Sequence, residues 1–286
     1  MMHHETDVIQ VPGAELRYVR QGTGPLLVLI AGGDGDAAAG APLAAQLEPH
    51  YTVLTYDRRG LSGSTIDDPE QPPTVTTHAD DVHHLLTALT TEPALVYGSS
   101  IGAMISLELA ARHPEQIRLL VAHEPPATQL LPEQDRAQAA TAQREVEEIF
   151  QKEGAMAALR KFLVLAGIDP ADREEDAPMR SPNPERIRNL EFFLTYDAPA
   201  VRHHRLDLDA LKGTHIVPAV GTNSGQVMAY RCALLLADRL GLPYAEFPGG
   251  HNGSVFRPKA FAARLHEVLE TPPDQRITTF AQESGD

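Results

Sequence analysis

The sequence has no tryptophan, a single cysteine and no long apolar run. Without about 18 consecutive apolar residues, no segment is typical of a membrane-spanning helix. Cys232, being alone, can form neither an internal disulfide nor a cysteine metal cluster, and we expect it to be a buried structural thiol. The N-terminal residues contain no apolar stretch of the kind found in secretion signals. Together these features favour a cytoplasmic protein in a reducing compartment.

Basic residues are too few to balance the acidic ones, and the formal net charge is −15. Nucleic acids and anionic membranes are therefore not expected as partners, because both are bound through Lys and Arg. No histidine pair has the spacing of a metal-binding helix: neither His123-Glu124 nor His266-Glu267 is followed by a second histidine at helical distance. We expect no metal and no cofactor. The sequence leaves open whether the protein is a monomer or a homodimer.

What the chain does contain is an alternation of short apolar runs and helical patterns. Strands are expected at residues 8–11, 15–22, 25–32, 51–57, 93–100, 117–124, 215–221 and 244–250, and helices at 37–47, 79–89, 101–112, 229–240 and 258–269. This alternation predicts an α/β fold with a mostly parallel sheet and helices on both faces.

Between residues 127 and 206 the strand signals disappear and the chain becomes helical and charged, as at 143–152 and 155–165. We interpret this stretch as a helical cap inserted after the strand that ends at Glu124. The expected core then comprises residues 1–126 and 207–270. The remaining residues, 271–286, are rich in proline, glutamine and charge, and are expected to form a flexible tail.

A candidate nucleophile lies where the apolar run 93–97 meets the helical pattern at 101–112. The connecting residues Gly98–Gly102 read G-S-S-I-G, which is the nucleophile-elbow pattern in its strand–turn–helix context. Such a turn forces its central residue, Ser100, into a strained conformation, and side chains at positions 98 and 102 would collide with neighbouring elements. The bare pattern also occurs by chance, so its flanking elements carry the argument.

Ser100 needs a histidine base late in the chain, and His251 follows the last expected strand in F-P-G-G-H-N-G. The alternative is an ordinary surface histidine. A histidine base also needs a carboxylate on its other nitrogen. The strand at 215–221 ends in V-G and continues as T-N-S-G with no acid in reach, whereas the preceding strand ends at Glu124. Glu124 is therefore the predicted acid, the alternative being a solvated glutamate before two prolines.

Two backbone amides are expected to stabilise an oxyanion, those of Ile101 and Gly33. Ile101 directly follows Ser100, and Gly33 lies in the glycine-rich loop after the strand at 25–32. These glycines could equally serve only to make a turn. Candidate pocket residues are Asp34 in the same loop and, from the cap, Phe192, Phe193 and Tyr196.

The motifs G-S-S-I-G-A, Y-D-R-R-G-L-S-G-S and F-P-G-G-H resemble those of the α/β-hydrolase superfamily. More narrowly, V-A-H-E-P-P-A-T-Q-L-L is similar to the zearalenone-hydrolysing lactonases, which take their triad glutamate from this strand end. The resemblance implies an α/β-hydrolase fold and a serine hydrolase acting on a small-molecule ester or lactone. It implies a triad of Ser100, Glu124 and His251, with Gly33 and Ile101 as the oxyanion hole.

Two other functions fit parts of the sequence. Residues 33–38 contain G-x-G-x-x-A before a helix, and the next strand ends at Asp57, as in nicotinamide-dependent oxidoreductases. Against this, Asp34 and Asp36 would repel a pyrophosphate. A relative of the hydrolases that only binds a ligand is the second alternative, because a fold alone does not establish activity.

Overall fold

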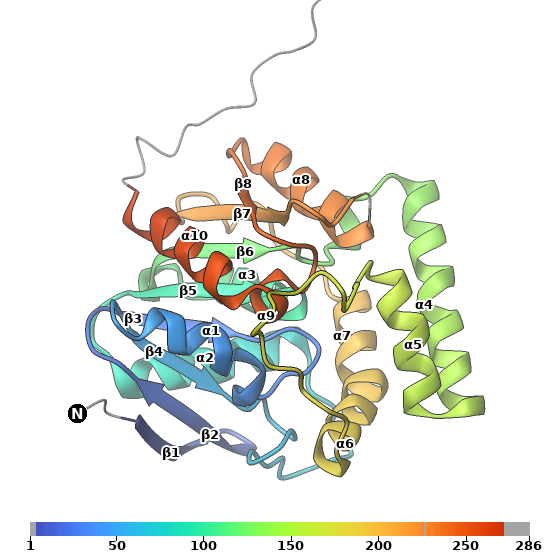
Figure 1. Ribbon diagram of the computed structural model, residues 1–286, viewed down its shortest axis with the longest axis horizontal. Coiled ribbons are helices and arrows are strands. Elements are labelled where there is room, and N and C mark those ends of the chain that lie inside the picture. The colour runs from blue at the N-terminus through green and yellow to red at the C-terminus, as the bar shows by residue number, and fades with distance from the viewer. Residues whose placement is uncertain (1–3, 226, 272–286) are drawn as a thin grey trace, which may run out of the picture.

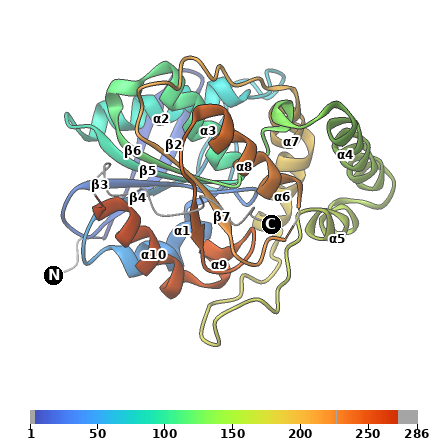
Figure 2. The ribbon, with the colours of Figure 1, turned by 90° about the horizontal axis from the view of Figure 1, so that it is seen from above.

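A twisted eight-stranded sheet runs through the molecule and carries helices on both faces (Figures 1 and 2). The computed structural model describes residues 4–225 and 227–271. The strands lie in the order β1-β2-β4-β3-β5-β6-β7-β8; pairs β1–β2 and β2–β4 are antiparallel and the rest are parallel. The strands are β1 His4–Val11, β2 Ala14–Gln21, β3 Leu26–Ile30, β4 Thr52–Tyr56, β5 Ala94–Ser99, β6 Ile117–His123, β7 Ile216–Gly221 and β8 Ala245–Phe247.

The central strands are apolar on both faces because helices cover both sides. Alternate residues of β3 illustrate this: Val28 and Ile30 belong to the core on one side of the sheet, and Leu27 and Leu29 to the core on the other. Figure 2 shows α2, α3 and α8 on one side, and α1, α9 and α10 on the other. The bounds of these helices are α1 Ala37–Leu47, α2 Val75–Leu89, α3 Ile101–Arg112, α8 Met228–Leu240, α9 Gly253–Phe256 and α10 Pro258–Glu270.

The predicted α/β architecture, a mostly parallel sheet with helices on both faces, is confirmed, and α1 and α3 have the predicted bounds. Helix α2 begins at Val75, before the predicted residue 79. A reciprocal cap fixes its start: Thr74 Oγ1 accepts from Thr77 N at 3.0 Å, and Thr77 Oγ1 accepts from Thr74 N at 3.3 Å. A capping box is usually recognised by Glu or Gln at its last position, so the threonine pair gives a weaker signal.

Residues 127–206, called the cap below, contain helices and no strand in the structure. In chain order they form η2 Thr128–Leu130, α4 Glu133–Glu153, α5 Ala155–Leu165, α6 Pro184–Phe192, the π-helical turn η3 Phe193–Asp197, and α7 Ala198–His203; a further short turn, η1 Pro114–Gln116, precedes β6. Helix α4 starts well before the predicted residue 143. The sequence did not indicate this start because Val146 is the one buried residue of the helix, so the apolar pattern is weak. In Figure 1, α4 to α7 lie together at one end of the sheet.

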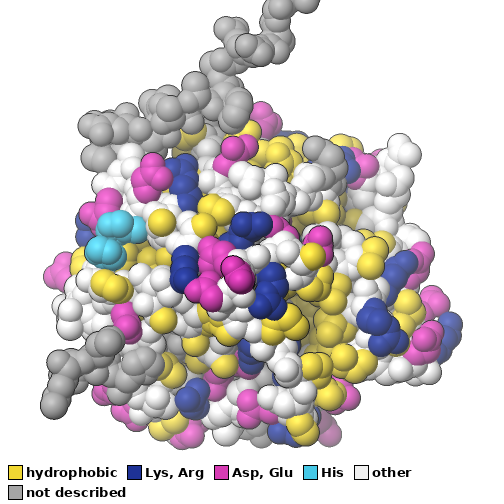
Figure 3. All heavy atoms as spheres, in the orientation of Figure 1, with side chains coloured by type: hydrophobic (Ala, Val, Ile, Leu, Met, Phe, Trp, Pro, Cys, Tyr) yellow, Lys and Arg dark blue, Asp and Glu magenta, His cyan; other side chains and the backbone are white. Residues whose placement is uncertain are grey.

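Figure 3 shows acidic and basic side chains interspersed over one face, with hydrophobic side chains gathered along the junction between the core and the cap. In the part of the chain that the structure describes, no helix is both long enough and apolar enough to cross a membrane. The predicted flexible tail, residues 271–286, lies outside the described residues except for Thr271.

Candidate active site

Ser100 occupies the sharp turn between β5 and α3, with φ 54° and ψ −120°. Glycines on both sides make this turn possible. A Cβ at position 98 would overlap the Gly102 carbonyl oxygen on α3, and one at position 102 would overlap the Ile30 carbonyl oxygen on β3. The Ser100 amide donates to the His123 carbonyl at 2.9 Å, which fixes the turn to β6. Strain of this kind persists only where the surrounding structure enforces it.

Glu124 follows β6 directly, is fully buried and also has a positive φ, of 48°. One carboxylate oxygen accepts from the Gly221 amide at 2.8 Å and from the Ser224 hydroxyl, and the other faces His251. Burial by itself raises the pKa of Glu124, but these hydrogen bonds and the nearby histidines outweigh it and lower the pKa from 4.5 to about 2. The carboxyl group is therefore ionised at neutral pH.

His251 lies in the loop after β8, with its Nδ1 atom 2.6 Å from Glu124 Oε2. The residue is 4% exposed. A cap residue holds its loop: Asp172 accepts from the Gly250 amide at 3.1 Å and from Arg257 Nε at 2.8 Å. This Glu–His hydrogen bond fixes the tautomer that carries the proton on Nδ1, and it leaves Nε2 free to accept a proton.

His123 lies next to Glu124 in sequence but belongs to the core. Neither ring nitrogen has a hydrogen-bond partner among the described residues, and the ring contacts Phe247 and Phe261 edge-on. Burial lowers the pKa of His123 from 6.5 to about 4, since the charged form would lose its water. The imidazole is therefore neutral and acts as an apolar packing group.

The loop that contains Gly33 approaches Ser100 closely. A Cβ on Gly32 would lie 3.5 Å from Ser100 Cβ, and one on Gly33 would lie 3.4 Å from the Phe193 ring. Arg58, which is 1% exposed, donates through Nη1 to the Gly32 carbonyl at 2.7 Å and through Nη2 to Asp197 at 2.9 Å. Asp197 ends the same π-helical turn that carries Phe193, so Arg58 joins this loop to the cap.

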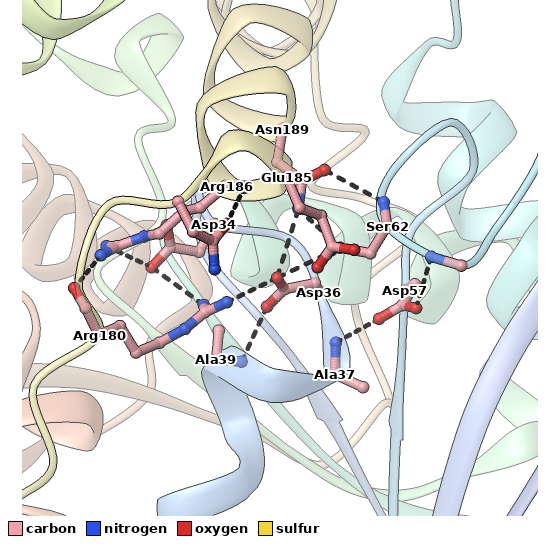
Figure 4. A network of polar contacts seen from close by, with 12 residues as sticks. Asp34, Asp36, Ala37, Ala39, Asp57, Ser62, Arg180, Glu185, Arg186 and Asn189 are labelled. Carbon is pink, nitrogen blue, oxygen red and sulfur yellow. Dashed lines mark hydrogen bonds and ion pairs between the residues drawn. The ribbon is translucent and has the colours of Figure 1, made fainter.

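A second set of contacts clamps the far end of this loop to the cap (Figure 4). Arg186 binds Asp34 with two hydrogen bonds, of 3.0 and 3.1 Å. Arg180 Nη2 donates to Asp36 at 2.7 Å, while Asp36 also caps α1 by accepting from the Ala39 amide at 2.9 Å. The acids come from the core loop and the arginines from the cap, so these pairs link the two parts of the chain.

Two cavities border Ser100 and His251, with volumes of about 110 and 70 Å³. Phe162 of α5 and Phe193 line both of them, and their rings meet edge to face with centroids 5.5 Å apart. The larger cavity reaches the Gly33 loop and contains the Asp34–Arg186 pair, so it has a charged wall. The smaller one extends along Ile101 and is almost wholly apolar.

The structure brings together most, but not all, of the residues singled out from the sequence. Ser100, His251, Gly33, Asp34 and Phe193 line the larger cavity, and Ile101 lines the smaller one. The structure does not bring Phe192 and Tyr196 to these cavities. They pack against each other with ring centroids 4.9 Å apart, and Phe192 also lies against Gly60. Successive helical residues point about 100° apart, so Phe192 and Phe193 cannot both face the site.

Several site residues gave no signal in the sequence. Phe162, Arg186 and Ser224 come from segments that are distant in the chain and meet only on folding, and none lies in a motif. The single hint was the Thr-Asn-Ser sequence after β7, which carries no acid yet supplies the Ser224 hydroxyl to Glu124.

The structure argues against the nucleotide-binding alternative, because the acid expected to bind a ribose, Asp57, is already engaged. Asp57 is 2% exposed, and its carboxylate accepts from the Ala37 amide at 2.7 Å and from the Gly63 amide at 3.0 Å. It therefore braces the start of α1 and cannot face a ribose. Within residues 4–225 and 227–271, no cluster of three or more His, Cys, Asp or Glu side chains could hold a metal ion.

Comparison with known proteins gives the family. An uncharacterized hydrolase of Bacillus subtilis, YraK, is 37% identical over 268 residues, which is 92% of this chain and 95% of YraK. The profile of the alpha/beta hydrolase fold matches residues 25–162. The chain belongs to the α/β-hydrolase family. Among solved structures, an α/β hydrolase from Sphaerobacter thermophilus is 26% identical with a TM-score of 0.67, covering 92% of this chain and 100% of the other.

A thermophilic esterase from Thermogutta terrifontis shares the fold of this hydrolase at 19% identity, with a TM-score of 0.69 over 94% of this chain and 98% of the esterase. At that identity the likeness extends to the fold alone. The family assignment makes the chain a hydrolase, and the chemistry of its site has to be argued from its own residues.

Proposed function

We propose that this protein is a serine hydrolase that cleaves a carboxylic ester or lactone through an acyl-enzyme. Ser100 is the nucleophile, His251 the general base and Glu124 the acid that orients it. The observation that carries the proposal is the 2.6 Å hydrogen bond from His251 to a buried, ionised glutamate, beside a serine in a strained elbow. Each component occurs elsewhere in proteins for other reasons, but their combination at a cavity serves acyl transfer.

In the first half-reaction His251 Nε2 takes the proton of Ser100 as Oγ attacks the carbonyl carbon. Glu124 stabilises the imidazolium that forms. The tetrahedral intermediate then collapses, its carbon–oxygen bond to the alcohol breaks, and His251 returns the proton to the leaving oxygen. A lactone keeps its freed hydroxyl on the acyl group. Water, deprotonated by His251, then attacks the acyl-enzyme and releases the acid, and Ser100 regains its proton.

The negative oxygen of the intermediate needs preorganised donors. The amide of Ile101 is the first of α3 and therefore has no acceptor within the helix, and the helix dipole favours negative charge there. Gly33 supplies the second amide from a loop that Arg58 and the cap hold against Ser100. Removing one such donor from a serine hydrolase typically costs about 10²–10³ in kcat.

The substrate class rests on the site and on sequence likeness together. Ser–His–Glu chemistry suits esters and lactones, since their leaving alkoxides need one proton and no metal. The lactone alternative comes from the V-A-H-E-P-P motif around Glu124, and the ester alternative from the esterase that shares the fold. Esters and lactones are cleaved by the same steps, so activity measured on a panel of esters and a panel of lactones decides between them.

The deciding experiment is reaction with a fluorophosphonate, followed by intact mass and peptide mapping, with Ser100→Ala as the control. One adduct per chain on Ser100, absent from the control, is expected, since only an activated serine reacts. A folded protein without an adduct would refute the proposal and favour a ligand-binding role. Labelling in the presence of candidate esters and lactones then ranks them by protection.

A further inference from the structure

The smaller cavity, of about 70 Å³, is apolar along its walls and polar at only a few positions. Ser100 and His251 lie where it meets the proposed reaction centre. Its walls are apolar and come from α3, α5, α7 and α8. They include Ile101, Leu165, Ala198, Val201, Met228 and Ala229. Apart from Ser100 and His251, one polar side chain lines this cavity, and it is Gln143 of α4.

The side-chain carbonyl oxygen of Gln143 has no hydrogen-bond donor among the described residues. This atom, Oε1, is buried. A buried amide oxygen gives up its bonds to water on folding and gains nothing unless another donor replaces them. Such atoms are rare in folded proteins, and each calls for an explanation. Here the atom belongs to a residue that lines a cavity bordered by Ser100, so a bound molecule can supply the missing partner once the side chain turns its amide towards the cavity.

The missing partner is expected to be neutral. No charged side chain lines the smaller cavity, whereas the larger one contains Asp34 and Arg186. A charged group among these apolar walls would lose its hydration without an opposite charge in return. An amide side chain can present its carbonyl oxygen or, after rotation, its NH₂ group, so it can meet either a donor or an acceptor.

We propose that Gln143 recognises, through a hydrogen bond, a neutral polar group at the end of an otherwise apolar substrate chain. The chain lies along the apolar walls from Ser100, and a hydroxyl, carbonyl or carboxamide at its tip bonds to Gln143. This inference rests on the proposed serine-hydrolase function and narrows its substrates to esters or lactones with a short apolar spacer that ends in such a group.

The test compares two sets of matched p-nitrophenyl esters with acyl spacers of increasing length. One set ends in a carboxamide, which offers both a donor and an acceptor, and the other ends in an isopropyl group of the same shape. Acetates of the corresponding alcohols provide a second arm, since the cavity touches both Ser100 and His251 and could take either side of the ester. The readout is the ratio of kcat/KM for carboxamide over isopropyl at each length.

Gln143→Leu is expected to lower that ratio about fivefold or more, at one spacer length and in one arm, because the variant removes the hydrogen bond and keeps the apolar volume. Gln138→Leu is the matched control, since Gln138 is exposed on the same helix, and it should leave the ratio unchanged. If the leucine variant does not fold, Gln143→Met, of similar length but without an amide, gives the same comparison.

An equal ratio in wild type and Gln143→Leu at every length would overturn the inference. Failure of the protein to cleave either set, although Ser100 reacts with a fluorophosphonate, would also overturn it. If Ser100 does not react at all, the proposed function itself fails, and the inference falls with it.

Discussion

At Glu124, burial and hydrogen bonding act on the same carboxyl group in opposite directions. Burial disfavours the charge, while Gly221, Ser224 and His251 all donate to it and prevail. The carboxylate also lies at the end of β6, although the sheet offers the end of β7 as well. The end of β7 supplies donors, the Gly221 amide and the Ser224 hydroxyl, so its role here is to hold the acid.

Glu124→Gln should lower kcat by about 10³–10⁴ while the protein stays folded. The amide keeps the size of the carboxylate and can still accept from Gly221, but its NH₂ group donates to His251 Nδ1 and selects the wrong tautomer. Steady-state kinetics on any ester cleaved by the wild type, with thermal unfolding as the control for folding, measures this. A kcat within tenfold of wild type would show that Glu124 is not the acid.

His123 predicts a specific loss of stability in acid. Its pKa is about 4 in the folded protein and near 6.5 when unfolded, so between these values the unfolded chain binds more protons. Stability is therefore fully present above pH 6.5 and falls as the pH drops towards 4, by about 3 kcal/mol. His123→Phe should remove this part of the pH dependence, since phenylalanine suits the aromatic surroundings and cannot titrate.

The measurement is the free energy of unfolding in urea across pH 4 to 7. The exposed His203→Phe is the control and should leave the slope between these values as in wild type. An unchanged slope in His123→Phe would mean that His123 has the same pKa in the folded and unfolded protein. Extending the series below pH 4.5 should show a second decline in both variants, because the unfolded chain then binds a proton at Glu124 that the folded protein, with a pKa of about 2, does not.

Among elements, the elbow and α3 show how a helix can depend on a residue that normally weakens helices. Gly102 lies in the first turn of α3, and a Cβ there would overlap the carbonyl oxygens of Ile30, the last residue of β3, and of Ala31, which follows it. Replacing a helical glycine with alanine normally stabilises a protein by about 1 kcal/mol. Gly102→Ala should instead destabilise by about 1–3 kcal/mol, because α3 must move away from β3.

Urea unfolding measures this, with Ala111→Gly near the other end of α3 as the comparison, where helix propensity alone predicts a loss of about 1 kcal/mol. A stabilised Gly102→Ala variant would contradict the close approach of α3 to β3. The same variant should lose reactivity at Ser100, since the displaced helix carries the Ile101 amide with it.

Elements differed in how well the sequence specified them. The strands β3 to β7 and helices α1 and α3 were predicted because each buries a continuous or periodic apolar pattern against the sheet. Helix α4 was placed too short, since Val146 is its one fully buried residue and its first two turns are mostly polar. The π-helical turn at Phe193–Asp197 had no sequence signal, and at its start Phe193 faces the site while Phe192 does not.

For the whole molecule, ion pairs connect the cap to the loop behind the proposed oxyanion hole. Arg180→Gln leaves the nearly buried carboxylate of Asp36 without its arginine. We expect a loss of about 1–3 kcal/mol in stability and a lower kcat/KM, because the Gly33 loop loses one of its links to the cap while those through Arg58 and Arg186 remain. Lys152→Gln breaks an exposed pair with Glu148 and should change stability by no more than about 0.5 kcal/mol.

Thermal unfolding and ester kinetics for the two variants test this together. A kcat/KM in Arg180→Gln equal to that of Lys152→Gln would show that the clamp has no effect on the site. A drop in stability that vanishes in high salt would point to surface screening, which buried pairs largely escape.

The sequence by itself determined the fold and the positions of Ser100, Glu124 and His251, because strand ends, a glycine-flanked elbow and triad order are local or ordered along the chain. Tertiary structure alone decided which cap side chains face the cavity, that Ser224 and Gly221 hold Glu124, and that Gln143 Oε1 lacks a hydrogen-bond partner among the described residues. Those contacts join residues far apart in sequence, and side-chain direction in irregular helices depends on packing that no local pattern encodes.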